Sequence, residues 1–109
     1  MSDRNKILAK SLVNYSCALK PGEKVLINAI GFSTLPLIKQ IVKETYKAGG
    51  YPYVELHDPS VTREIMLGCK EEQLEFLKNV DMFRMKGMDA YIGVRGNDNS
   101  AELSDVPPD

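Results

Sequence analysis

The sequence predicts an α/β domain with a small three-stranded parallel sheet flanked by helices. Three short segments, residues 25–29, 51–57 and 89–94, have the apolar or alternating character of strands. Segments with helical spacing of apolar residues separate them, and strands that alternate with helices form parallel sheets with right-handed crossovers. A chain of 109 residues suffices for one hydrophobic core and is too short for two, so we expect one domain over residues 1–109.

The first helix is predicted from four apolar residues that recur at helical spacing, namely Leu8, Leu12, Tyr15 and Leu19. A Pro-Gly turn at residues 20–23 follows. Residues 25–29 are almost continuously apolar, which is typical of a strand that is covered on both faces. This strand is therefore expected at the centre of the sheet.

The second helix is predicted to begin at Ser33 as N-cap, with Pro36 in its first turn. Its apolar stripe comprises Leu35, Ile38, Val42 and Tyr46, widened by Leu37 and Ile41. Gly49 and Gly50 supply the C-terminal cap.

The second strand, residues 51–57, alternates between apolar and polar side chains. Val54 and Leu56 point one way, whereas Tyr53, Glu55 and His57 point the other. This half-polar pattern favours an edge strand and a strand order of 2-1-3, which resembles half of a flavodoxin-like fold.

Two further helices are predicted before the third strand. Asp58 and Pro59 form a cap followed by a first-turn proline, and Val61 and Ile65 are expected to face inward. The next helix covers about residues 71–84, with Leu74, Leu77 and Val80 inward.

The third strand, residues 89–94, leads into a polar turn and a proline-containing end. A strand in such a series is normally followed by a helix that covers the sheet, and here that helix is absent or stunted. We therefore expect the chain to be the N-terminal domain of a longer protein.

Composition argues against several classes of protein. The net charge is −1 and no basic stripe occurs, so no nucleic-acid partner is expected. No apolar run predicts a signal peptide or a membrane association. Cys17 and Cys69 lack metal or redox spacing and are typical of free thiols in a reducing cytoplasm, so a cytoplasmic location is predicted.

Parallel sheets bind ligands at the carboxyl ends of their strands, where three loops qualify here. Ser33 precedes a helix N-terminus that could hold an anion, but no phosphate-binding glycine motif is present and the cap role is favoured. His57 and Asp58 are residue types that could bind a metal or transfer a proton. However, side chains of neighbouring strand residues point to opposite faces of the sheet, and Asp58 is already explained as a helix cap. One histidine and two scattered cysteines do not make a zinc site.

Arg95 is the best single candidate for a specific role. At the end of an apolar strand, it could clamp a carboxylate with two hydrogen bonds. It could equally pair with Asp98, Glu102 or an acidic neighbour in another domain. We therefore name Arg95, His57, Asp58 and Ser33 as ligand-facing or interdomain candidates, and no residue as catalytic or metal-binding.

An ordered set of segments resembles the N-terminal part of the thermophilic-type metalloaminopeptidases, peptidase family M29 (aminopeptidase T or S, leucyl aminopeptidase). The segments are residues 12–16, 20–27, 48–50, 56–59 and 89–92, followed by Arg95, Gly96, Asn99 and residues 102–106. The resemblance implies a longer dimeric hydrolase whose separate C-terminal catalytic domain carries two divalent metal ions (zinc, cobalt or manganese) that activate water for attack on a peptide substrate. None of its Glu, His and Asp ligand motifs occurs here, so the chain by itself is expected to be inactive and to hold no cofactor.

Two functions are therefore predicted, in order of preference. The first is the N-terminal, non-catalytic domain of a two-metal aminopeptidase that removes N-terminal amino acids from peptides. The second is a stand-alone flavodoxin-like module that binds a small anion at the loops of Ser33 and Arg95.

Overall fold

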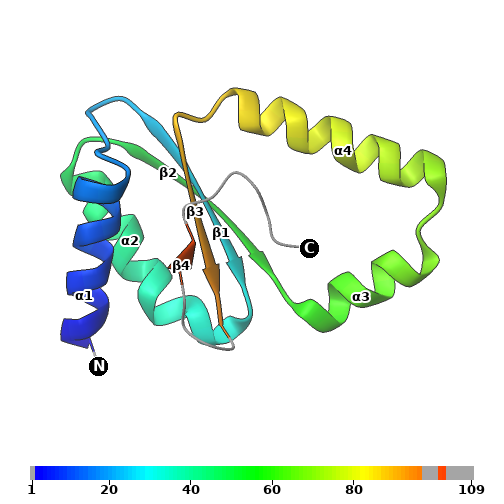
Figure 1. Cartoon of the computed structure of the whole chain (residues 1–109), viewed down its shortest axis with the longest axis horizontal. Coiled ribbons are helices and arrows are strands. Elements are labelled where there is room, and N and C mark those ends of the chain that lie inside the picture. The colour runs from blue at the N-terminus through cyan, green and yellow to red at the C-terminus, as the bar shows by residue number, and fades with distance from the viewer. Residues whose placement is uncertain (1, 97–100, 103–109) are drawn as a thin grey trace.

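The computed structural model describes residues 2–96 and 101–102 of the chain (Figure 1). The helical elements are α1 (Ser2–Ser11), the π-helical turn η1 (Leu12–Ser16), the 3-10 turn η2 (Phe32–Thr34), α2 (Leu35–Lys47), α3 (Pro59–Gly68) and α4 (Glu71–Lys86). The strands are β1 (Lys24–Ile30), β2 (Tyr51–His57), β3 (Ala90–Arg95) and β4 (Ala101–Glu102).

The sheet has the order β2-β1-β3-β4. β1 pairs in parallel with β2 on one side and β3 on the other, which confirms the predicted α/β class and the 2-1-3 order. The short β4, which the sequence analysis did not predict, pairs antiparallel with β3. A strand of two residues carries no periodicity from which it could be predicted.

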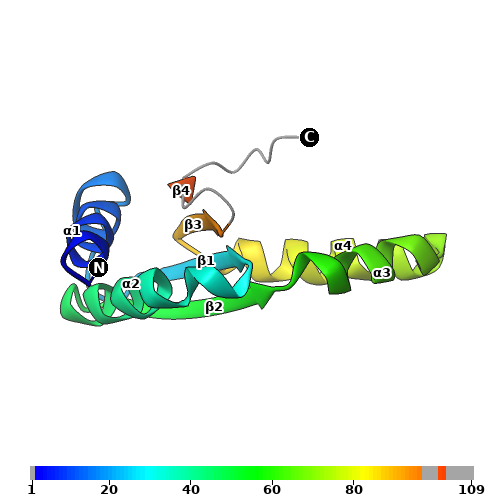
Figure 2. The same cartoon turned by 90° about the horizontal axis from the view of Figure 1, so that it is seen from below.

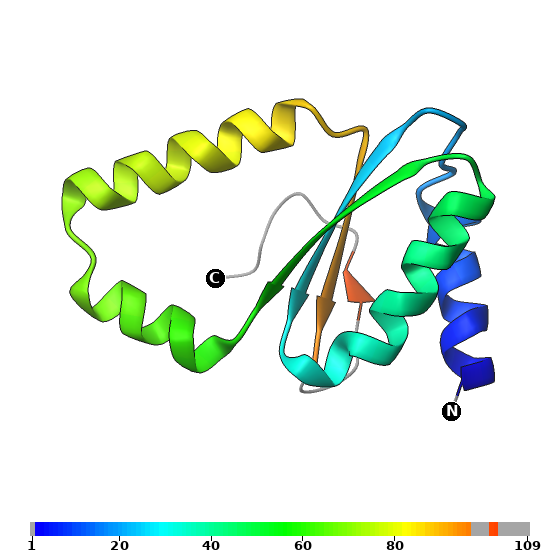
Figure 3. The same ribbon diagram turned by 180° about the vertical axis from the view of Figure 1, so that it is seen from behind.

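The core lies between one face of the sheet and the pair α1 and α2, which run side by side along one flank (Figure 3). Val25, Ile27 and Ala29 of β1 are fully buried there, and Ile92 of β3 lies beside them. Ile41 of α2 is also fully buried against this cluster. The apolar face of β1 is thus the centre of the hydrophobic core.

The first helix departs from its predicted periodicity. Tyr15 is 77% exposed, and Val13 is buried in its place. The cause is η1, in which the Cys17 N–H donates to the carbonyl of Leu12 five residues earlier. This wider turn rotates the following residues relative to an α-helix, so a 3.6-residue period fails beyond Leu12.

The second helix, α2, differs from its prediction in its N-cap and in the residue that faces the core near its C-terminus. Its N-cap is Thr34, one residue after the predicted Ser33, because η2 occupies residues 32–34. Tyr46, predicted to be inward, is 63% exposed, while Thr45 is fully buried. At the other end the Gly49 cap is confirmed, with a positive φ and the paired Gly49–Tyr46 and Gly50–Thr45 backbone bonds of a Schellman motif.

α3 and α4 do not cover the sheet. They extend past the edge strand β2, roughly in line with the sheet (Figure 1, Figure 2). The residues predicted to face inward are exposed, except Leu77, which is half-buried: Val61 by 57%, Ile65 by 43%, Leu74 by 39% and Val80 by 40%. The inward assignment was wrong because helical spacing shows which residues share a face and not what covers that face.

The projecting helices also account for the flat, elongated shape of the molecule. The radius of gyration is 14.5 Å, against about 13 Å for a compact domain of this length. Much of the apolar surface of α3 and α4 therefore contributes little to the core.

Replacement of Ile41 by Ala should lower the free energy of unfolding by about 2–5 kcal/mol, because a fully buried side chain leaves a cavity. Val61→Ala in α3 is the matched control and should change it by less than about 0.5 kcal/mol. Urea unfolding followed by circular dichroism measures both. Equal losses of unfolding free energy in the two variants would mean that Val61 of α3 is buried against other residues in solution.

Candidate functional site

The face of the sheet opposite the core carries a set of polar side chains in register. In β1, Asn28 and Ile30 point to this face, because alternate residues of the same strand are buried in the core. Ile30 is paired with His57 of β2 and with Arg95 of β3. Partners in register share a face, so His57 and Arg95 flank Ile30 with Cα atoms about 10 Å apart, two strand spacings.

An ionic cluster links this face to α4. The Arg84 guanidinium contacts the Glu55 carboxylate and also donates to Asp81 Oδ1 over 2.6 Å. His57 Nε2 lies 3.5 Å from the other oxygen of Glu55. The cluster therefore ties the C-terminal half of α4 to the edge strand β2.

Asn28 lies at the centre of the same face. Its Nδ2 donates to the hydroxyl of Tyr91 over 3.0 Å. Asn28 Oδ1 and Arg84 Nε are buried without a hydrogen-bond partner among the described residues. A buried polar group without a partner destabilises the fold, so both atoms carry a free-energy cost in this structure.

The loops at the carboxyl edge are held together by backbone hydrogen bonds. The Gly31 N–H donates to the carbonyl of His57, and the Gly96 N–H donates to that of Ile30, each over 2.8 Å. Ser33 Oγ donates to the Gly96 carbonyl over 3.1 Å. Ser33 therefore joins two strand-end loops instead of capping α2.

Asp58 occupies the predicted N-cap position of α3, but its side chain makes no capping bond. Its carboxylate accepts a bond from the Ser60 hydroxyl, and its carbonyl accepts the N–H groups of Val61 and Thr62. Asp58 thus serves to start α3.

Arg95 is half-buried at the end of β3 and already makes an interaction within the chain. Of the two acidic partners considered from the sequence, Asp98 and the Glu102 side chain lie outside the described residues. The structure brings Arg95 and His57 to one face. Ser33 instead joins the loops after β1 and β3, and Asp58 begins α3.

The sequence analysis missed Asn28, Tyr91 and Arg84 as members of this face. The alternation of β2 already placed Glu55 beside His57, but the position of Arg84 depends on the path of α4. That path carries no local sequence signal.

No cluster of metal ligands is found in the part of the chain that the structure describes. No group of three or more His, Cys, Asp or Glu side chains lies close enough there to hold a metal ion. Burial raises the pKa of the Cys17 thiol, which keeps it protonated at neutral pH. Among the described helices, none combines the length and apolar character that a membrane crossing requires.

Comparison with known proteins identifies a family and a protein of similar fold. The family model described as thermophilic metalloprotease (M29) matches residues 1–109. The structure of wild-type AmpT from Thermus thermophilus superposes with a TM-score of 0.54 and 21% sequence identity, over 68% of this chain and 19% of that chain. The chain thus spans about a fifth of the length of that protein, and the likeness shows a shared fold. No curated protein sequence matches.

Replacement of Gly96 by Ala should destabilise the carboxyl edge by about 1–3 kcal/mol. A Cβ at Gly96 would lie 2.4 Å from Ser33 Oγ and 3.0 Å from the carbonyl oxygen of Ile30. Adding Ser33→Ala should recover part of the loss by removing the nearer atom. Thermal unfolding of the two single variants and the double variant measures this coupling, and strictly additive effects would contradict the contact.

Proposed function

The chain belongs to the thermophilic metalloprotease family M29, and from this membership we propose that it is the N-terminal, non-catalytic domain of a two-metal aminopeptidase. The whole protein would remove N-terminal amino acids from peptides. The match of the family model over all of residues 1–109 carries the proposal. It is supported by the fold shared with AmpT, of which the chain spans 19%.

The proposal assigns the metals to a separate catalytic domain. The described residues of this chain do not fit a two-metal centre, since they contain no group of three or more potential ligands. In the whole protein, two divalent ions of the zinc, cobalt or manganese class would activate a water for attack on the peptide bond. The present domain would contribute binding surface and shape to that protein.

The polar face of the sheet is the proposed contact with the catalytic domain. Among the described helices, α4 reaches this face through Arg84 and Glu55, and none packs extensively along it. His57 and Arg95 lie at its carboxyl edge, where parallel sheets meet their ligands. We further propose that the whole protein is a cytoplasmic homodimer.

A small-anion module is the alternative, and the loop geometry disfavours it. A cavity of about 260 Å³ lies beside the start of α2 and is lined in part by Arg4, Ser33 and Thr34. However, the Ser33 hydroxyl is bonded to the Gly96 carbonyl, and the Thr34 hydroxyl donates to the Gly31 carbonyl over 2.7 Å. Both hydroxyls are therefore engaged within the fold.

The 109-residue chain should show no aminopeptidase turnover and bind no metal tightly. The reason is that the described residues lack a ligand set. Hydrolysis of aminoacyl-anilides with added cobalt or zinc, and metal analysis after dialysis, measure the two properties. A protein that also contains the catalytic domain is the positive control. Turnover or stoichiometric metal in the isolated chain would refute the assignment.

In such a longer protein, Arg95→Met should weaken substrate binding or domain association by about tenfold, the value of one charge-assisted contact. KM and resistance to limited proteolysis at the domain boundary report the two effects. If both were unchanged, Arg95 would be an ordinary surface charge.

A further inference from the structure

A cavity of about 350 Å³ lies between α1 and α2 on one flank of the molecule. Four of the residues that line it are lysines, Lys6 and Lys10 from α1 and Lys43 and Lys47 from α2. One acidic residue, Glu44, also lines it, so the lining carries a net charge of +3. The volume falls within the range of small-molecule sites, about 300–1,000 Å³.

The packing of α1 against α2 gathers these lysines from distant parts of the sequence. Within each helix the two lysines are four residues apart, which places them on one side of the helix and about 6 Å apart along its axis. The two pairs face each other across helices that pack about 8–10 Å apart. Together α1 and α2 carry six basic and two acidic residues, whereas the whole chain has a net charge of −1. The flank is therefore electropositive although the chain is not.

Most of this positive charge has no counter-charge within the described residues. Lys47 Nζ lies 3.4 Å from Glu44 Oε2, and Glu44 is only 5% exposed, so its carboxylate belongs to the wall of the cavity. No salt bridge of the described residues involves Lys6, Lys10 or Lys43. Like charges four residues apart on a helix destabilise it, and a bound anion would remove that repulsion.

We propose that this cavity, the α1–α2 lysine site, binds a condensed phosphate, that is, two or three linked phosphoryl groups. Lysine binds phosphate as a point charge, and four ammonium groups around one cavity suit an anion whose charges are spread along a short chain. The described lining includes no arginine, whose fork recognises a planar carboxylate. A cavity lined by one sign of charge also raises the local concentration of its counter-ions. The inference holds whether or not the protein is a peptidase.

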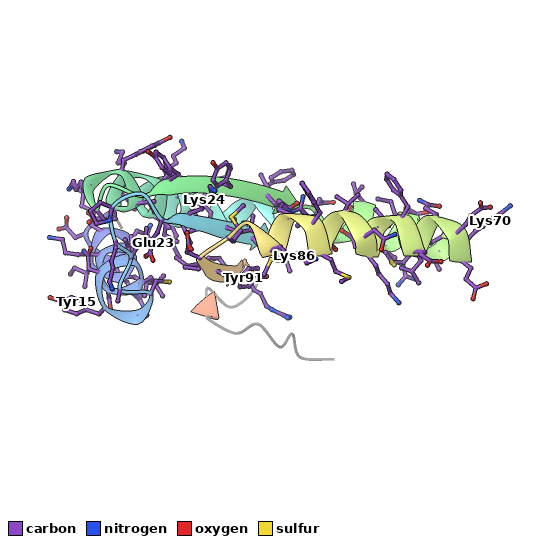
Figure 4. All side chains as sticks on the ribbon, turned by 90° about the horizontal axis from the view of Figure 1, so that it is seen from above. Tyr15, Glu23, Lys24, Lys70, Lys86 and Tyr91 are labelled. Atoms are coloured by element: carbon purple, nitrogen blue, oxygen red, sulfur yellow. The ribbon has the colours of Figure 1, made fainter. Side chains whose placement is uncertain are left out.

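The lysine site is separate from the carboxyl edge of the sheet. The cavity beside the start of α2, which Arg4 and Ser33 help to line, shares no lining residue with it. The lysine site is also remote from α4. Figure 4 shows α1 and α2 at the opposite end of the molecule from Lys70, which precedes α4. An exposed lysine of α4, Lys78, therefore serves as a matched control.

Isothermal titration calorimetry of the 109-residue chain with inorganic tripolyphosphate, at low salt and with a chelator present, tests the proposal. One site with a dissociation constant on the order of 10–100 μM is expected. Salt at 0.5 M should raise this constant by at least about tenfold, because it screens exposed charges. Orthophosphate, which carries fewer charges, should bind at least about tenfold more weakly.

ATP distinguishes two sources of the same phosphate chain. Affinity equal to that of tripolyphosphate would mean that the site binds the chain alone and accepts nucleotides as well. Weaker binding of ATP would identify the ligand as a free condensed phosphate, and tighter binding would identify it as a nucleotide.

Charge variants locate the binding in the cavity. Lys10→Gln and Lys43→Gln should each raise the dissociation constant by about three- to fivefold, and the double variant by at least about tenfold. Lys78→Gln, the same change on α4, should leave it unchanged. Glu44→Gln should instead lower it by about three- to fivefold, because it removes the negative charge from the lining and releases Lys47. Circular dichroism checks that the variants fold, and a gain in affinity does not arise from misfolding.

Three results would overturn the proposal. The first is the absence of saturable binding of tripolyphosphate. The second is an equal loss on Lys78→Gln and Lys10→Gln, which would show a dependence on net charge alone. The third comes from amide chemical shifts, which should change mainly at residues 6–10 and 40–47, since changes confined to Ser33 and Thr34 would place the anion at the start of α2. A hydrolase assay plays no role here, so failure of this site and failure of the peptidase assignment are separately visible.

Discussion

The burial of β1 between two parallel partners is the constraint on which the fold depends. Its Val25, Ile27 and Ala29 fill the core beneath α1 and α2, while its backbone bonds to β2 and β3. Because parallel pairing fixes register, β1 also determines which residues of the outer strands share a face. The alignment of His57, Ile30 and Arg95 follows from that register, so the packing of the core positions the candidate site.

The two faces of the sheet are unequal. One is covered by α1 and α2, whereas the other carries Asn28, Glu55 and Tyr91 and is joined to α4 by the Arg84–Glu55 contact. In a parallel sheet both faces are normally covered. The projecting α3 and α4 therefore leave two surfaces of different chemistry, a polar one on the sheet and an apolar one on α4. We assign the polar surface to a contact with a catalytic domain.

Turn chemistry explains how the loops after β1, β2 and β3 are joined at the carboxyl edge of the sheet. Gly31 adopts a positive φ, and Gly96 leaves no room for a Cβ beside Ser33. The backbone bonds from both glycines close the loops onto neighbouring strands. Ser33 and Thr34 are thereby committed to the fold, whereas His57 and Arg95 lie at the carboxyl ends of β2 and β3 on either side of Ile30.

Periodicity and turn residues in the sequence were sufficient to predict the α/β class, the central β1, the edge β2 and the Gly49 cap, because these depend on local patterns. The placement of Tyr15, Val61 and Leu74 was not predictable in this way. It depends on a π-turn that shifts the helical phase and on the direction in which α3 and α4 leave the sheet. Hydrophobic spacing identifies a face, but contacts between distant segments decide whether that face is covered.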